Sequence, residues 1–168
     1  MLLTACDQKY LPEAKILIKS CARHEPDQRF YLYLVGINRD EETTISSWHP
    51  KIIVDKGTWP YHSDPRPGMI NCIRSIALEK VLKKYHEPSV YLDSDTILRG
   101  PLTKLFEILE SYDLSVKYRP ELKQRGVVNS PHASTFSSGI IAIRPSDEGI
   151  QFASEYNIRV HSQDQAKI

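Results

Sequence analysis

The sequence contains no long apolar run and little cysteine. None of its hydrophobic stretches approaches the ~18 consecutive apolar residues of a membrane-spanning helix. Its cysteines, Cys6, Cys21 and Cys72, are odd in number and widely spaced, and none forms a Cys-x-x-Cys pair or a cluster with histidine. We therefore expect neither a disulfide framework nor a zinc site, but buried, reduced thiols of the kind found in a cytoplasmic protein.

An excess of charge of one sign is also missing. The 22 Lys and Arg residues nearly balance the 21 Asp and Glu residues, so the formal net charge is only +1. This balance excludes a broad basic surface that would bind nucleic acid without specificity. Met1 leads directly into strand-like residues and then into charged ones, so no signal peptide is expected.

Two glycine-rich phosphate-binding motifs are absent. Rossmann dehydrogenases carry G-x-G-x-x-G after the first strand, and P-loop nucleotidases carry G-x-x-x-x-G-K-[ST] there. Here that turn reads Asp7-Gln8-Lys9-Tyr10. Asp7 could accept a hydrogen bond from a nucleotide base on which Tyr10 stacks. Alternatively, Asp7 caps the following helix and Tyr10 packs on its side.

The chain has the size and composition of one globular domain. It has 168 residues, of which 40% are hydrophobic and 26% charged. Apolar segments predict strands at 1–6, 29–35, 51–54, 90–92, 113–118 and 136–143. Amphipathic spacing predicts helices at 11–21, 40–48, 69–85, 102–109 and 145–160. Residues 57–68 and 119–133 are predicted loops. The alternation predicts an α/β fold with a mostly parallel central sheet flanked by helices.

Two aspartates follow one of these apolar strands. In the segment VYLDSD, Asp93 and Asp95 stand where the strand leaves the core. On a strand, positions i and i+2 share one face about 6–7 Å apart, within reach of one divalent cation. Oxygen-only ligation favours Mg²⁺ or Mn²⁺, which complete their shells with substrate phosphates. Alternatively, Asp95 serves only as a cap for a turn or the next helix.

Three further features lack a unique interpretation. Arg74 lies in an apolar helix and requires a carboxylate or phosphate partner, unless its side chain extends to the surface. The small residues Ser137-Ser138-Gly139 interrupt a strand, which indicates close approach of a ligand or a bulge. By composition, Asp164-Gln165 belongs to an exposed polar tail. The six histidines show no ligand spacing, and we expect most of them to be solvated.

Taken in order, five segments resemble GT-A fold glycosyltransferases, and most closely the retaining enzymes of glycosyltransferase family 8. The segments are TACDQKYLPEAKILIKSCARHEPD, CIRSIALEKVL, VYLDSDTILRGPLTKLFEIL, TFSSGIIAIRPS and QDQ. The resemblance covers nearly the whole chain. It implies a metal-dependent hexosyltransferase of polysaccharide biosynthesis that moves a sugar from UDP to a glycan or another hydroxyl acceptor.

The resemblance also implies roles for individual residues. Asp93 and Asp95 would bind Mn²⁺ or Mg²⁺, and Asp164 and Gln165 would be the catalytic residues near the anomeric carbon. The implied donor-binding residues are Ala5, Asp7, Tyr10, Arg74, Ser94, Ser137, Ser138 and Gly139. Among these, Ala5, Asp7 and Tyr10 would hold the uracil and Ser94 would lie near the ribose. Arg74 would contact the sugar-phosphate region and brace the aspartates, and the small residues of the last strand would line the sugar pocket.

Two departures from the family pattern limit these implications. Ser137 stands where the family usually has asparagine. The sequence also ends before the family's histidine-containing segment, which supplies a third metal ligand. The resemblance therefore implies one C-terminally short domain over residues 1–168, which is truncated, minimal or inactive. An inactive binding module and a nucleotidyltransferase are the alternatives, although the latter would carry a glycine-rich basic loop. Any membrane association would come through segments outside this sequence.

Overall fold

The structure is a computed structural model that describes residues 1–36, 42–58, 69–118 and 136–165. At positions 42–43, 69–71, 118, 136–138 and 163–165 it describes the backbone alone. Most of the predicted loops at 57–68 and 119–133 lies outside the described residues.

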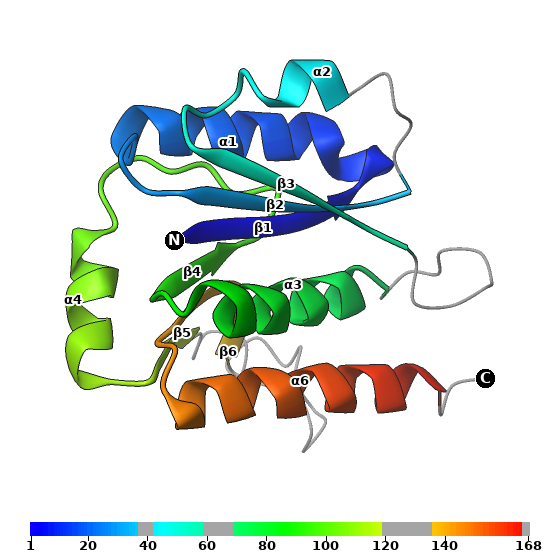
Figure 1. The fold of residues 1–168 in the computed structure, drawn as a ribbon, viewed down its shortest axis with the longest axis vertical. Helices are drawn as coiled ribbons and strands as arrows, with labels where there is room; N and C mark the ends of the chain where they lie inside the picture. Colours follow the sequence, from blue (N-terminus) through cyan, green and yellow to red (C-terminus); the bar gives the residue numbers. More distant parts are fainter. Residues whose placement is uncertain (37–41, 59–68, 119–135, 166–168) are drawn as a thin grey trace, which may run out of the picture.

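A six-stranded sheet in the order β3-β2-β1-β4-β6-β5 forms the centre of the molecule (Figure 1). Its parallel part comprises β1 (Leu2–Asp7), β2 (Phe30–Val35), β3 (Ile52–Gly57) and β4 (Ser89–Leu92). The strand β6 (Phe136–Ile143) runs antiparallel to β4 and to the edge strand β5 (Leu114–Tyr118). The predicted α/β class with a mostly parallel sheet is confirmed.

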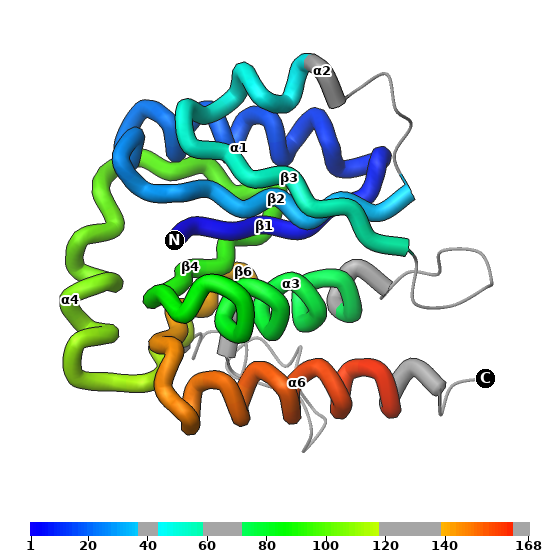
Figure 2. Tube along the Cα trace, viewed as in Figure 1, coloured from blue at the N-terminus to red at the C-terminus, as the bar shows by residue number. Residues whose placement is uncertain are grey.

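Helices cover both faces of this sheet. One face carries α1 (Leu11–His24) and α4 (Thr103–Ser111), and the other carries α3 (Met69–Tyr85) and α6 (Asp147–Gln165) (Figures 1 and 2). The short helix η1 (Gln8–Tyr10) precedes α1, and α2 (Glu42–Ile45) precedes β3. Within the described ranges, no helix has both the length and the apolar character needed to cross a bilayer.

The two faces have separate hydrophobic cores because side chains alternate along each strand. In β2, Phe30, Leu32 and Leu34 pack on the α1 side. Tyr31, Tyr33 and Val35 pack on the α3 side. Because both faces are covered, β2 is apolar along its whole length instead of alternating with polar residues, as buried parallel strands usually are.

Two predicted elements differ from the structure. The helix expected at 40–48 is the four-residue α2. The polar tail expected at Asp164-Gln165 is wrong, because the backbone of α6 stays helical to Gln165. The segment after Pro145 contains no further proline, and its single glycine lies in the first turn, so nothing in it breaks the helix.

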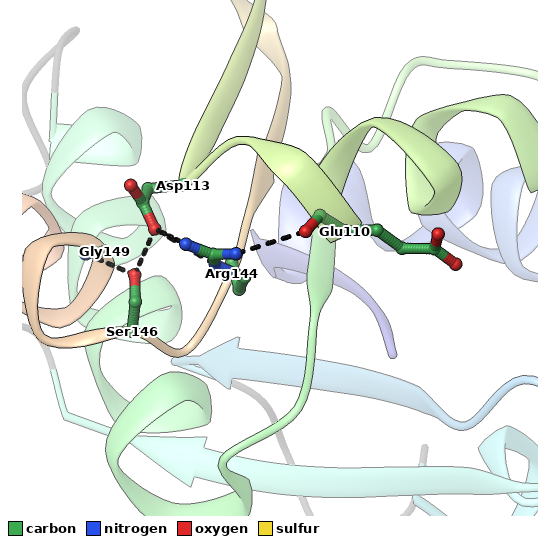
Figure 3. A network of polar contacts seen from close by, with 5 residues as sticks. All are labelled: Glu110, Asp113, Arg144, Ser146 and Gly149. Carbon is green, nitrogen blue, oxygen red and sulfur yellow. Dashed lines mark hydrogen bonds and ion pairs between the residues drawn. The ribbon is translucent and has the colours of Figure 1, made fainter.

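A polar cluster fixes the amino end of α6 (Figure 3). Arg144 donates from Nε and Nη2 to Oδ1 of Asp113 at 3.0 and 2.5 Å, and Ser146 Oγ donates to the same oxygen at 2.5 Å. Ser146 Oγ also accepts from the backbone N–H of Gly149 at 3.2 Å, which caps the helix. Hydrogen bonds from Ser146 and Arg144 lower the pKa of Asp113, so it remains a carboxylate at neutral pH.

Gly149→Ala is expected to destabilise the protein by about 1–3 kcal/mol. A Cβ at this position would lie 2.0 Å from the carbonyl oxygen of Arg144, a backbone atom that cannot move aside without disturbing the cap. Urea unfolding measures the effect. Gly100→Ala is the matched control, because a Cβ there meets no atom within 4 Å. Equal unfolding midpoints for both variants would contradict this account of the cap.

Stability is also expected to fall in mild acid because of His49. This side chain, an exception to the expected solvated histidines, is only 2% exposed, and its Nδ1 accepts from the backbone N–H of Lys51 at 3.1 Å. Burial lowers the pKa of His49 from its ordinary value near 6.5. Below pH 6.5 the unfolded chain therefore binds a proton that the folded chain resists, and stability is lost as pH falls.

Unfolding free energies at pH 7.5 and pH 5 check this dependence. His49→Asn keeps an acceptor on a shorter side chain but cannot titrate, so it should lose less stability than the wild type over that interval. The same loss in both proteins would show that His49 does not cause the acid sensitivity.

Candidate active site

The candidate site lies where the order of the parallel strands reverses. From β1 the chain adds β2 and β3 on one side, and then crosses to place β4 on the other. Ligands of open α/β sheets bind beyond the carboxyl ends of the strands at such a point. Asp7 ends β1, and Asp93 directly follows β4. The topology therefore brings the two predicted groups to the same crevice.

The sheet opens between β1 and β4 near their carboxyl ends. The two strands pair at Leu2 with Val90 and at Leu3 with Tyr91, and no further pair follows in this described part of the chain. At the next position, Thr4 Oγ1 donates to the carbonyl oxygen of Leu92 at 2.7 Å. A side chain of β1 thus bonds to β4 just beyond the last paired residues.

Asp93, Ser94 and Asp95 form a turn after β4. Asp93 donates its backbone N–H to the carbonyl oxygen of Gly139 on β6 at 2.9 Å, and Thr96 donates to the carbonyl oxygen of Asp93 at 3.0 Å. Ser94 is buried, Asp93 is half-buried and Asp95 is exposed. The expectation that both carboxylates share one face of a strand is wrong, because β4 ends at Leu92 and a turn begins.

Arg74 reaches this turn from α3. It is 5% exposed, and its Nη2 lies 2.8 Å from Oδ1 of Asp93. Its guanidinium group also stacks over the ring of Tyr91, with 5.1 Å between Cζ and the ring centroid. The required partner of Arg74 is therefore the Asp93 carboxylate, and the surface alternative is wrong.

Tyr91 gives Asp93 a second partner. Its hydroxyl donates to Oδ1 of Asp93 at 3.1 Å. Burial raises the pKa of Asp93, and the Arg74 charge and the Tyr91 hydrogen bond partly offset that effect. Burial alone would lower the pKa of Arg74, but Tyr91 and Asp93 together raise it, so Arg74 stays charged. The ion pair with Arg74 and the hydrogen bond from Tyr91 both use Oδ1, which leaves Oδ2 of Asp93 and the Asp95 carboxylate for another ligand.

These oxygens fit a hard divalent cation only together with a second molecule. No group of three or more His, Cys, Asp or Glu side chains that could hold an ion occurs among the residues that the structure describes. Asp93 and Asp95 supply carboxylate oxygens, the ligands that Mg²⁺ and Mn²⁺ prefer. Magnesium sites of this sparse kind are completed by substrate phosphates. The donor set therefore suits a cation that binds with a nucleotide diphosphate.

Asp7 and Tyr10 lie on the β1 side of the crevice. Oδ1 of Asp7 accepts from the backbone N–H of Tyr10 at 3.1 Å, so Asp7 caps η1, as the alternative interpretation predicted. Oδ2 is left as an acceptor for a base. Tyr10 is half-buried, with Lys9 Nζ 5.3 Å from its ring centroid. The side chain of Ala5 is 1% exposed and packs in the core on the α3 side.

The remaining candidates lie on two elements. Gly139 is next to the Asp93 turn through its backbone hydrogen bond. Ser137 and Ser138 precede it on β6, and Asp164 and Gln165 end α6, but the side chains of these four residues lie outside the described part.

Sequence reasoning missed Tyr91 and Thr4. Tyr91 precedes Asp93 by two residues, the spacing of one strand face, and that spacing could have identified it as a partner. Thr4 is the one polar residue in the apolar start LLTAC of the first strand. A polar residue in a buried strand needs a hydrogen-bond partner, and this requirement was the available signal.

No protein-family model matches the chain, and no curated protein does. Solved structures do match it. An active-site mutant of LgtC aligns with a TM-score of 0.64 at 17% identity over 95% of this chain. The glycosyltransferase GlyE of Streptococcus pneumoniae TIGR4 aligns with a TM-score of 0.63 at 18% identity over 99%. Mouse xyloside xylosyltransferase 1 aligns with a TM-score of 0.54 at 15% identity over 95%.

The chain has the GT-A fold. The predicted fold class is therefore confirmed at the level of architecture, while identities below 20% show the fold alone. The chain spans 64% of the LgtC chain and 39% of the GlyE chain. The ligands and the reactions of these proteins are therefore assigned to this GT-A chain only as a proposal.

Proposed function

We propose that this GT-A domain binds a UDP-sugar with Mn²⁺ or Mg²⁺ and transfers the sugar to a hydroxyl acceptor with retention of configuration. One observation carries the proposal: the crevice at the strand reversal combines a pair of carboxylates after β4 with an acidic residue and a tyrosine after β1. A diphosphate with its cation suits the first pair, and a base suits the second.

The proposed roles of the individual residues, apart from that of Tyr91, are those that the family resemblance implies. Asp93 and Asp95 would hold the cation, with Ser94 near the ribose. Arg74 and Tyr91 would fix the Asp93 carboxylate. The residues around the nucleoside would be Ala5, Asp7 and Tyr10, and those around the sugar would be Ser137, Ser138, Gly139, Asp164 and Gln165.

The chemistry explains why these groups would be useful. Cleavage of the sugar–phosphate bond leaves negative charge on UDP, which a bound cation stabilises. The anomeric carbon gains positive charge at the same time, and a nearby carboxylate or amide oxygen from positions 164 and 165 would stabilise it. Arg74 and Tyr91 contribute by holding Asp93 in one orientation before the donor arrives.

Among the similar structures, LgtC is described as a galactosyltransferase crystallised with donor and acceptor sugar analogs. It aligns over 96% of this chain with a TM-score of 0.61 at 18% identity, and this chain spans 65% of it. Xyloside xylosyltransferase 1 is named for sugar transfer as well. These similarities support sugar transfer in general terms, and the acceptor is not part of the proposal beyond its hydroxyl group.

Release of UDP from UDP-galactose, UDP-glucose and UDP-xylose tests the proposal. The assay needs no acceptor, because water can accept the sugar slowly. We expect release from at least one donor with Mn²⁺ and none with EDTA. Mn²⁺-dependent UDP binding without any release, also when oligosaccharide acceptors are present, would identify an inactive binding module. A protein that neither binds UDP nor releases it from any donor would contradict the proposed function.

A further inference from the structure

A polar seam joins α3 to α6. The two helices lie side by side and run in opposite directions (Figures 1 and 2). Glu79 of α3 is its centre: Oε1 accepts from Ser154 Oγ at 2.8 Å and from Lys83 Nζ at 2.6 Å, and Oε2 accepts from Asn157 Nδ2 at 2.6 Å. Burial alone would raise the pKa of Glu79, but these three hydrogen bonds lower it, so the acceptor stays charged.

Asn157 of α6 forms hydrogen bonds with side chains at two positions of α3. Besides its bond to Glu79, its Oδ1 accepts from Ser75 Oγ at 2.9 Å, a hydroxyl whose single hydrogen is shared with the carbonyl oxygen of Cys72 at 2.8 Å. Ser75 and Glu79 are one helical turn apart on the same face of α3. Both ends of the Asn157 amide are therefore used, and hydrogen bonds have narrow limits on distance and angle. Only one register of α6 along α3 satisfies both contacts.

Apolar packing does not set this register along the whole helix. Ile150, Ala153 and Tyr156 of α6 join the core on the α3 side. After Tyr156, no side chain in the described part of α6 belongs to that core. Ile158, for example, is 67% exposed. Since apolar burial is also non-directional, the directional Asn157 contacts help to fix the position of the second half of α6.

The end of α6 carries the two proposed catalytic positions. Position 164 follows Asn157 by seven residues, about two helical turns, so the two Cα atoms lie on the same side of the helix roughly 10.5 Å apart. Figure 1 shows this end of α6 at the same side of the molecule as the carboxyl ends of β1, β2 and β3. A shift in register at Asn157 would therefore move positions 164 and 165 relative to the crevice.

We propose that Asn157 is a positioning residue, whose bonds to Ser75 and Glu79 set the register of α6 and hold positions 164 and 165 at the crevice. This inference rests on the proposed function. It concerns turnover and not donor binding, because Asn157 contacts none of the residues assigned to the cation or the nucleoside.

Asn157→Leu tests the inference, since leucine has a similar size and makes neither bond. We expect kcat for UDP release from the preferred UDP-sugar to fall about 10- to 100-fold, the usual effect of a displacement near 1 Å. The Kd of UDP with Mn²⁺ and the KM of the donor should change less than about twofold, since the cation and base residues stay in place. Gln151→Leu is the control, because Gln151 is exposed on the same helix and bonds to its neighbour Glu155. It should keep the wild-type kcat.

Ser75→Ala is a milder second variant if Asn157→Leu does not fold. It removes the donor to Oδ1 of Asn157 and leaves the Glu79 bonds, so a smaller fall in kcat with unchanged Kd is expected. If Asn157→Leu folds and keeps the wild-type kcat, the inference is overturned and the proposed function stands. If Asn157→Leu does not fold, a wild-type kcat in Ser75→Ala has the same consequence. An equal loss of UDP affinity and kcat would also overturn it, because general loosening acts on both. A wild-type protein without UDP release would instead reject the proposed function, and the positioning role with it.

Discussion

Asp95→Ala is expected to weaken Mn²⁺-dependent binding of UDP by about 100-fold. Among the described residues, the carboxylates of Asp93 and Asp95 supply the proposed cation site, and Oδ1 of Asp93 is already occupied by its ion pair with Arg74 and its hydrogen bond from Tyr91. Removing Asp95 takes away half of the negative charge offered to the ion. An interaction with a charged group contributes about 1.5–3 kcal/mol, which corresponds to a change of this size. Isothermal titration with UDP at saturating Mn²⁺ measures it.

The stability of the Asp95 variant separates binding from folding. Asp95 is exposed, so its removal should change the free energy of unfolding by less than about 0.5 kcal/mol. Glu107→Ala removes an exposed carboxylate from α4 and should leave both UDP binding and stability unchanged. If Asp95→Ala binds UDP and Mn²⁺ with the wild-type Kd, Asp95 is not a ligand of the cation.

Arg74→Leu is expected to reduce stability by on the order of 3 kcal/mol and to abolish UDP binding. Arg74 and Asp93 form an ion pair in which the side chains are 6% and 30% exposed. Without Arg74, Asp93 keeps only the Tyr91 hydroxyl as a partner in a site where burial already raises its pKa. Lysine should not restore either property, because it lacks the planar group that stacks on Tyr91.

A double variant identifies the cause of the Arg74 effect. Arg74→Leu combined with Asp93→Asn leaves no unpaired buried charge, so stability should recover in part relative to Arg74→Leu alone. UDP binding should stay absent, because Asp93→Asn removes a cation ligand. Chemical unfolding and UDP titration of the single and double variants check both statements. Equal stability of the two proteins would show that the unpaired carboxylate is not what destabilises Arg74→Leu.

The sequence was sufficient to predict the order and type of most elements. Segments such as FYLYLV are apolar throughout, and only strands covered on both faces have this pattern. The helix at 69–85 was predicted at its observed bounds from its apolar spacing. The need of Arg74 for a carboxylate or phosphate partner could be predicted because a charged residue in an apolar helix requires one, unless its side chain extends to the surface.

The geometry at the aspartates could not be predicted in the same way. Whether Asp93 and Asp95 continue a strand or form a turn depends on how far β1 and β6 pair with β4. That pairing involves Thr4, which is 88 positions from its partner Leu92, and Gly139, which is 46 positions from its partner Asp93. Local composition carries no information on such pairings. The extension of α6 from position 161 to 165 was missed for another reason: these residues are polar, although no proline or glycine among them breaks the helix.

The central claim is that a divalent cation, held by Asp93 and Asp95, binds the diphosphate of a UDP-sugar. Isothermal titration of the wild-type protein with UDP, once with Mn²⁺ and once with EDTA, tests it most directly. The account predicts saturable binding with Mn²⁺ and at least about 100-fold weaker binding with EDTA, because the diphosphate would then meet two carboxylates without a bridging ion. Equal affinity in both buffers, or no binding in either, would contradict it.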